Sequence, residues 1–330
     1  MINDEKAQKA FETKAAQLEL LCVEKRSLAS RLISRLSYWT AEVYGFGKHM
    51  RKYGYYPKWL PLCVYTDHSP GNRDTEFPHE VTSTAPVQFY HSPERVARWR
   101  KTSKKPCYCL YSPYVFYRES QKIEKSKDAK GTLAFPAHTT DALEDASNIS
   151  EYIEQLKKLP AEFQPVSICL HASDIKKGAH KIYLSEGFDV YTAGHPFNDE
   201  FVERFYSIIR VFKYSTSNLG GSYLYYCVEM GIPFFLYGNE PKFINKADPN
   251  IEKGEYTSYK TQKSYMELVG LFSNIGTIIS EDQRKFVRTG LGIEDGLSRG
   301  QTTRILYAAL FRCIFKISNL ILPFKFLRKN

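Results

Sequence analysis

Short apolar segments alternate with helix-like segments along the second half of the chain, between residues 131 and 238. Turn-forming residues bound each apolar segment, which is typical of buried strands. The segments between them carry apolar positions at helical spacing. This alternation predicts a parallel, doubly wound sheet and therefore an α/β fold. The expected strands begin at Gly131 and, further along, cover residues 166–171, 188–193, 213–215 and 233–237.

The first half of the chain is less regular. Residues 4–37 lack Gly and Pro and predict one long helix, whose end is basic and amphipathic. Residues 44–59 are rich in Tyr, Gly and Lys and are interpreted as a loop. The remaining expected elements are strands at 60–66, 86–90 and 107–111, a basic helix at 93–101 and a linker at 118–130. These patterns predict two domains, residues 1–125 and 126–300, followed by a C-terminal segment, residues 301–330.

A loop rich in Ser, Thr and Gly follows the strand at 213–215 and leads into a helix. Free backbone N–H groups and the helix dipole favour an anion such as a phosphate at that point. The structural alternative is a turn in which Ser217 or Asn218 caps the helix. If the anion is the phosphate of a nucleotide-sugar donor, the candidate donor-binding residues in this loop are Ser217, Asn218, Gly220, Gly221 and Ser222.

Other polar residues follow strands or lie on the same helix. Glu229, later in the helix, could bind the two hydroxyls of a ribose, although a solvated helix charge is the alternative. His138 and Thr139 follow the strand that begins at Gly131, and His195 follows a Gly at another strand end. Ligands of open α/β sheets bind at the carboxyl ends of the strands, so these three residues are candidates for contact with donor phosphates. Ordinary structural turns are the alternative.

Asp67 and His68 follow a strand of the first half, in a turn-forming sequence. A sugar transfer that inverts configuration needs a base to take the proton of the acceptor hydroxyl. Asp67 or His68 is the candidate for that base. An Asx-turn with a surface histidine is the alternative.

The net charge of +10 is conspicuous at the C-terminus, where residues 305–330 hold five Lys/Arg, no acids and many large apolar residues. This composition predicts an interfacial anchor on an anionic membrane surface, and a helix packed across the domains is the alternative. The sequence contains no recognisable nucleic-acid motif, secretory signal or transmembrane run. We therefore expect a cytoplasmic protein, peripheral on the inner membrane, with no nucleic-acid partner. The absence of DxD and paired metal-ligand motifs leads us to expect no metal cofactor.

The stretch KYSTSNLGGSYLYYCVEMGIPFFLYGNEP resembles the C-terminal domain of GT-B glycosyltransferases of bacterial surface-polysaccharide synthesis, including lipopolysaccharide and capsule. GTLAFPAHTT is similar to the first strand and loop of that domain, and TDHSPG is more loosely similar to an acceptor-domain catalytic loop. The resemblance implies two Rossmann-like domains that face a central cleft. The first would bind the acceptor, and the second would bind the nucleotide-sugar, with Glu229 on its ribose or sugar.

These observations predict a glycosyltransferase that moves a sugar from a nucleotide-sugar to a lipid-linked or oligosaccharide acceptor. A CDP-alditol phosphotransferase and a nucleotide-sugar epimerase of the same fold are alternatives. A non-catalytic, membrane-associated assembly protein is a third. The positive charge would suit an acidic sugar activated by CMP, or an anionic acceptor.

Overall fold

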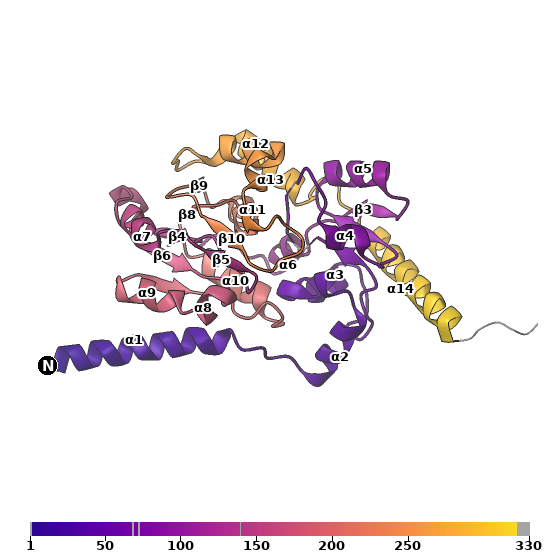
Figure 1. Cartoon of the computed structure of the whole chain (residues 1–330), viewed down its shortest axis with the longest axis horizontal. Coiled ribbons are helices and arrows are strands. Elements are labelled where there is room, and N and C mark those ends of the chain that lie inside the picture. Colours follow the sequence, from indigo (N-terminus) through magenta and orange to yellow (C-terminus); the bar gives the residue numbers. More distant parts are fainter. Residues whose placement is uncertain (1, 68, 72, 139, 322–330) are drawn as a thin grey trace, which may run out of the picture.

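A five-stranded parallel sheet forms the centre of the second half of the chain (Figure 1). The computed structural model describes residues 2–67, 69–71, 73–138 and 140–321. The strand order is β7-β6-β4-β8-β9, so the chain builds outward from β4 on one side and then crosses to β8 on the other. The strands are β4 (Thr132–Ala134), β6 (Val166–Cys169), β7 (Asp189–Tyr191), β8 (Tyr214–Ser217) and β9 (Phe234–Leu236). The predicted α/β fold with a doubly wound sheet is confirmed.

Helices connect these strands and cover the sheet. They are α7 (Ile149–Lys157), α8 (Ala172–Lys176), α9 (Ala179–Ser185), α10 (Phe201–Ile209) and α11 (Ser222–Glu229), with a short 3-10 helix at Ala161–Phe163. The central strands β4, β6 and β8 are buried along their whole length, as expected for parallel strands covered on both faces.

The first half contains a smaller parallel sheet in the order β1-β2-β3. Its elements are β1 (Tyr65–Thr66), β2 (Gln88–Tyr90), β3 (Cys107–Cys109), α3 (Phe46–Tyr53), α4 (Pro78–Thr82), α5 (Pro93–Thr102), α6 (Pro113–Ser120) and 3-10 turns at Trp39–Ala41 and Val43–Gly45. The loop expected at 44–59 is wrong, because α3 forms there and buries Phe46 and Met50 on one face. Of the strand expected at 60–66, only the two residues of β1 form, and Pro61 has no N–H to donate to a longer ladder of hydrogen bonds between strands.

The long helix expected at 4–37 is two helices, α1 (Ile2–Leu21) and α2 (Leu28–Leu36). Asn198 holds the segment between them, since its side chain accepts from the Lys25 N–H and donates to the Val23 carbonyl. Ser27 then caps α2. Tertiary contacts therefore override the local helical preference. They also hold α1 on the second half, where Leu18 joins the core beside the large sheet.

A small antiparallel sheet in the order β11-β10-β5 was not expected from the sequence. It consists of β5 (Leu143–Asp145), β10 (Phe243–Asn245) and β11 (Gly254–Glu255). The remaining elements are a 3-10 turn at Ser258–Thr261 and helices α12 (Lys263–Phe272), α13 (Glu281–Gly290) and α14 (Arg299–Ile321).

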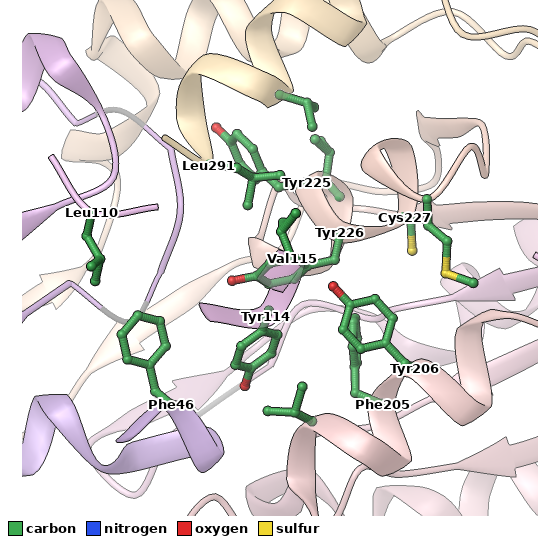
Figure 2. Close-up of a cluster of buried hydrophobic side chains, with 14 of the residues drawn as sticks. Phe46, Leu110, Tyr114, Val115, Phe205, Tyr206, Tyr225, Tyr226, Cys227 and Leu291 are labelled. Atoms are coloured by element: carbon green, nitrogen blue, oxygen red, sulfur yellow. The ribbon is translucent and has the colours of Figure 1, made fainter. Parts of the chain in front are cut away.

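One hydrophobic cluster spans both halves of the chain. Figure 2 shows Phe46, Leu110, Tyr114 and Val115 of the first half facing Phe205, Tyr206, Tyr225 and Tyr226 of the second. The rings of Tyr114 and Tyr226 stack with centroids 4.7 Å apart. Side chains therefore fill this part of the junction, and the predicted cleft between two domains is not confirmed.

Helix α14 returns from the second half to the first and packs on the end of α3. Thr303 donates to the Gly54 carbonyl, and Leu306 is buried against Gly54, where a Cβ would approach its Cδ1 to 2.8 Å. Leu306 and Leu310 are thus core residues, as in the alternative of a packed C-terminal helix. Residues 322–330 of the predicted membrane segment lie outside the described residues.

Candidate functional site at the carboxyl edge of the large sheet

A histidine follows each of three neighbouring strands of the large sheet, within a few residues of the strand's end. His138 comes after β4, His171 after β6 and His195 after β7. The rings of His138 and His171 stack with centroids 4.6 Å apart and planes 28° apart. The structure therefore gathers imidazole groups at the edge where open α/β sheets bind ligands.

His171 is held in one neutral form. Its Nδ1 accepts from the backbone N–H of Ser173 at 3.2 Å, so the ring proton lies on Nε2. That Nε2 then donates to the Tyr44 hydroxyl, 3.2 Å away. Burial, together with the charges of His138 and His195, lowers the pKa of His171 to about 3. His171 is therefore a positioning group and not a proton acceptor near neutral pH.

Tyr44 connects the first half of the chain to this edge. Its backbone has φ 58° and ψ 30°, a left-handed conformation that costs roughly 1–2 kcal/mol for a residue other than Gly. Surrounding hydrogen bonds hold it there, because its N–H donates to the Pro196 carbonyl and its carbonyl accepts from the Tyr114 hydroxyl. Burial raises the pKa of the Tyr44 hydroxyl to about 12. This hydroxyl is therefore a fixed neutral partner for His171.

A pocket of about 530 Å³ opens beside these histidines. Its volume falls within the range of small-ligand sites, roughly 300–1,000 Å³. The lining comes from the end of α1 and from the loops after β4, β6 and β7, and includes Glu19, Cys22, Thr140, Asp141, His171, Ser173, Lys176 and His195. The pocket thus lies where α1 closes over the edge of the sheet.

His195 is the predicted site residue that lines this pocket. Its Nδ1 accepts from the backbone N–H of Phe197 at 3.2 Å, so Nε2 carries the proton in the neutral ring. Burial lowers the pKa of His195, which favours that neutral form. His195 can therefore donate one hydrogen bond to an oxygen of a bound ligand.

The Ser/Gly loop after β8 lies at the same edge, next to the loop after β4. The side chain of Asn218 joins the loops, because it accepts from the Ala137 N–H and donates to the Asn239 carbonyl. The buried hydroxyl of Ser217 accepts from the Leu219 N–H and lies 2.8 Å from the Tyr223 hydroxyl. Ser217 and Asn218 therefore shape the loop through contacts within the protein.

Helix α11 begins at Ser222 without a side-chain cap. Its N-cap residue is Gly221, in an extended conformation, and Gly220 and Ser222 are half-buried. A Cβ on Gly220 would meet Leu268 at 2.7 Å, so a larger residue at this position would clash with Leu268. The first N–H groups of α11 have no side-chain acceptor at the N-cap, and the helix dipole adds positive charge there. This end of α11 is suited to an anion.

Glu229 lies at the opposite end of α11, away from that loop. Arg118 of α6 binds its carboxylate through two nitrogens, at 2.6 and 2.8 Å. Burial raises the pKa of Glu229, and Arg118 opposes that shift. The structure does not bring Glu229 together with Ser222 and the histidines, and both of its oxygens have a protein partner.

Asp67 lies at the carboxyl end of the first sheet, in a buried charge cluster. Its carboxylate accepts from Arg95 and from the backbone N–H of Ser69. Arg95 also binds Glu76 and Glu80. Asp67 is therefore a counter-ion of a buried guanidinium in this structure. The other two predicted site residues, His68 and Thr139, lie outside the described residues.

Within the described residues, no group of three or more His, Cys, Asp or Glu side chains is arranged to hold a metal ion. In the same part of the chain, every helix is too short or too polar to cross a membrane.

Sequence reasoning missed His171, Tyr44 and Arg118. His171 had a local signal, since it follows the apolar strand VSIC as His138 and His195 follow theirs. Tyr44 had none, because its partner His171 is 127 residues away in the chain. The partner of Arg118 is likewise 111 residues away.

No family model matches the chain, and neither does any curated protein. Among solved structures, the chain is similar to the wall teichoic acid polymerase TagF, at 12% identity and a TM-score of 0.39, over 79% of this chain and 71% of that one. It is also similar to MnaA from S. aureus in a structure with UDP, at 12% identity and a TM-score of 0.37, over 96% of this chain and 82% of that one. A third similarity is to the glycosylation-associated protein complex Gap123 from Streptococcus agalactiae, at 13% identity and a TM-score of 0.28, over 71% of this chain and 42% of that one. Identities and TM-scores this low carry no residue correspondence, so the assignment below rests on the geometry of this chain.

Proposed function

We propose that this protein is a glycosyltransferase of cell-surface polysaccharide synthesis. It takes a sugar from a nucleotide-sugar bound at the carboxyl edge of the five-stranded sheet and transfers it to a glycan or lipid-linked acceptor. The observation that carries the proposal is the convergence of hydrogen-bond donors at that edge. An uncapped helix N-terminus follows β8, and His195, with its proton on Nε2, follows β7; the stacked pair His138 and His171 lies between them, after β4 and β6.

The position of these groups matches the chemistry of a nucleotide leaving group. As the bond between the sugar and the phosphate breaks, negative charge grows on the phosphate oxygens. The N–H groups of α11 at Ser222, the helix dipole and Nε2–H of His195 are fixed donors that favour such charge. The order of the sheet reverses between β4 and β8, which is where doubly wound sheets bind nucleotides.

The acceptor hydroxyl must lose a proton during the transfer. Asp67 and His68 remain the proposed bases. The loop that follows Asp67 packs against α11, because Gly71 lies directly against the ring and hydroxyl of Tyr225. This proximity supports a role for the Asp67 loop beside the donor-binding helix.

A thermal-shift panel of UDP, GDP, CDP, CMP and dTDP tests the proposal. A ligand at about 100 times its Kd stabilises the native state by about 2.7 kcal/mol, which should raise Tm by roughly 5 °C or more. We expect one nucleotide to give such a shift and His195→Ala to reduce it. The matched control is His79→Ala, on α4 of the first half, which should keep the full shift.

Two results would contradict the proposal. One is a folded protein whose Tm does not move with any nucleotide, which would favour the non-catalytic assembly role. The other is a nucleotide shift that is the same in His195→Ala and in the natural sequence.

A further inference from the structure

Helix α2 presents an apolar stripe that the rest of the molecule does not cover. None of its residues is buried. Leu28, Leu32 and Leu36 are spaced four residues apart and therefore lie on one face. Leu28 is 75% exposed and Leu36 is 70% exposed. Single exposed leucines are common, but a continuous stripe on a helix outside the body of the molecule indicates an interaction surface (Figure 1).

Two exposed tryptophans lie beside the end of this stripe. Trp39 is the third residue after α2, and Trp59 is brought close by hydrogen bonds around Ser37, the C-cap of α2. Ser37 Oγ accepts from the Leu62 N–H, and Arg51 donates both to Ser37 Oγ and to the Leu60 carbonyl. Trp is favoured at membrane–water interfaces, because its ring is apolar while its N–H can remain hydrated.

The charge around the stripe is almost entirely positive. Between residues 25 and 66 the sequence holds eight Lys/Arg and a single acid, Glu42, whose carboxylate is paired inside the protein with Arg51. Arg31 and Arg35 are exposed on α2 itself. Glu24, just before this segment, pairs with Arg26 and lies 3.4 Å from Arg31. This surface is complementary to a negatively charged plane.

The exposed part of α14 lies on the same side of the molecule (Figure 1). Beyond its buried residues, α14 exposes Phe311, Ile314 and Phe315, with Arg312 among them. Tyr38, two residues after α2, donates its N–H to the Leu62 carbonyl, and Leu62 belongs to the hydrophobic cluster against which Cys313 of α14 packs. The two helices therefore contribute to one surface.

We propose that this α2 surface, defined by Leu28, Arg31, Leu32, Arg35, Leu36, Trp39 and Trp59, docks on an anionic lipid bilayer. The helix would lie in the plane of the interface, with its leucines among the acyl chains and its arginines among the headgroups. The exposed turn of α14 would add apolar area beside it. The inference does not depend on the proposed transfer reaction.

Vesicle flotation with the full chain tests this docking. Vesicles of equimolar phosphatidylcholine and phosphatidylglycerol should bind the protein, and vesicles of phosphatidylcholine alone should bind it much more weakly. Leu28→Ser/Leu36→Ser should lower the partition coefficient by at least tenfold. The matched control is Met266→Ser/Ile278→Ser, which removes two apolar side chains of similar exposure, on and after α12, and should leave binding unchanged.

Removal of charge gives an independent measurement. Arg31→Gln/Arg35→Gln should weaken partitioning roughly thirtyfold at low salt, since each of the two basic residues near an anionic surface contributes about 1 kcal/mol. Two results would overturn the proposal. In one, the natural sequence does not float with anionic vesicles. Ultracentrifugation shows dimers instead, and Leu28→Ser/Leu36→Ser abolishes these dimers. In the other, the folded Leu28→Ser/Leu36→Ser protein binds anionic vesicles as well as the natural sequence does.

Discussion

The histidines at the edge of the large sheet act as oriented donors because of one local geometry. In both His171 and His195, Nδ1 accepts the backbone N–H of the residue two positions later. The proton of the neutral ring is therefore on Nε2, which faces Tyr44 in the first case and is left for a ligand in the second. This arrangement favours binding of oxygen atoms over proton abstraction.

The lowered pKa of His171 should make stability depend on pH. Its pKa is lowered to about 3, below the ordinary value of 6.5, so between these values the unfolded chain binds a proton that the folded chain does not. Stability is therefore lost as pH falls from about 6.5, by at most about 1.4 kcal/mol per pH unit. We expect the Tm of His171→Asn, which retains a side chain suited to cap α8, to fall less than that of the natural sequence between pH 7 and pH 4.5. Equal slopes in differential scanning calorimetry would contradict this interpretation.

Asp67 is the proposed base of the reaction, and its carboxylate also pairs with Arg95 in the buried charge cluster. One pair of variants separates these two roles. If Asp67 is the base, Asp67→Asn should lower kcat by roughly 10²–10⁴-fold, measured as release of nucleotide from the donor. The matched control is Glu76→Gln, which also removes a carboxylate from Arg95 and should lower Tm without that loss of kcat. A kcat that falls equally in both variants, or in neither, would remove Asp67 from the reaction.

Among the helices, α11 is the one on which the proposed donor binding depends. It begins at the edge of the sheet without a side-chain cap, and its other end is tied to α6 through Glu229 and Arg118. The helix is therefore fixed at one end and has open N–H groups at the other, which is the geometry of an anion site.

Ser222→Asp should have opposite effects on stability and on binding. A carboxylate in the first turn of α11 interacts favourably with the helix dipole, so the free protein should gain about 0.5 kcal/mol. The same charge repels a phosphate, so nucleotide affinity in titration calorimetry should fall about tenfold or more. Ser222→Asn, which adds no charge, is the control and should retain most of the affinity. An unchanged Kd in Ser222→Asp would place the phosphate elsewhere.

The large sheet was predictable because short segments bounded by turn residues recur between helix-like segments, and its central strands β4, β6 and β8 are buried along their whole length. The break between α1 and α2 was not, since it depends on Asn198, 173 residues beyond Lys25. The positions of His138 and His195 after strands of the large sheet were predictable, because position after a strand is a local property. The Tyr44–His171 and Arg118–Glu229 pairs were missed because local patterns carry no information on which distant residues meet.

In the whole molecule, the two halves share a hydrophobic core, and each half also has a helix that packs on the other half. Helix α1 precedes the first sheet but packs beside the second, and α14 follows the second sheet but packs on α3. The junction between the sheets is filled with aromatic side chains (Figure 2). We therefore expect the halves to unfold together.

The first turns of α14 should behave as core and not as a detachable anchor. Leu306 is buried against Gly54, so Leu306→Ala should cost about 2–5 kcal/mol in the free energy of unfolding, measured by urea denaturation. Phe311→Ala, one turn later on the exposed side, should cost little. A Leu306→Ala protein as stable as the natural sequence would show that α14 does not contribute to the folded core.

Hydrogen–deuterium exchange with the nucleotide that gives the largest thermal shift tests whether the donor binds at the carboxyl edge of the large sheet. Donor binding at the carboxyl edge of the large sheet predicts slower exchange in residues 135–140, 192–197 and 217–223, together and at saturating ligand. Residues 85–112, in the first sheet, should exchange as in the free protein. Protection confined to the first sheet, or unchanged exchange in all three loops while the nucleotide is bound, would contradict the account.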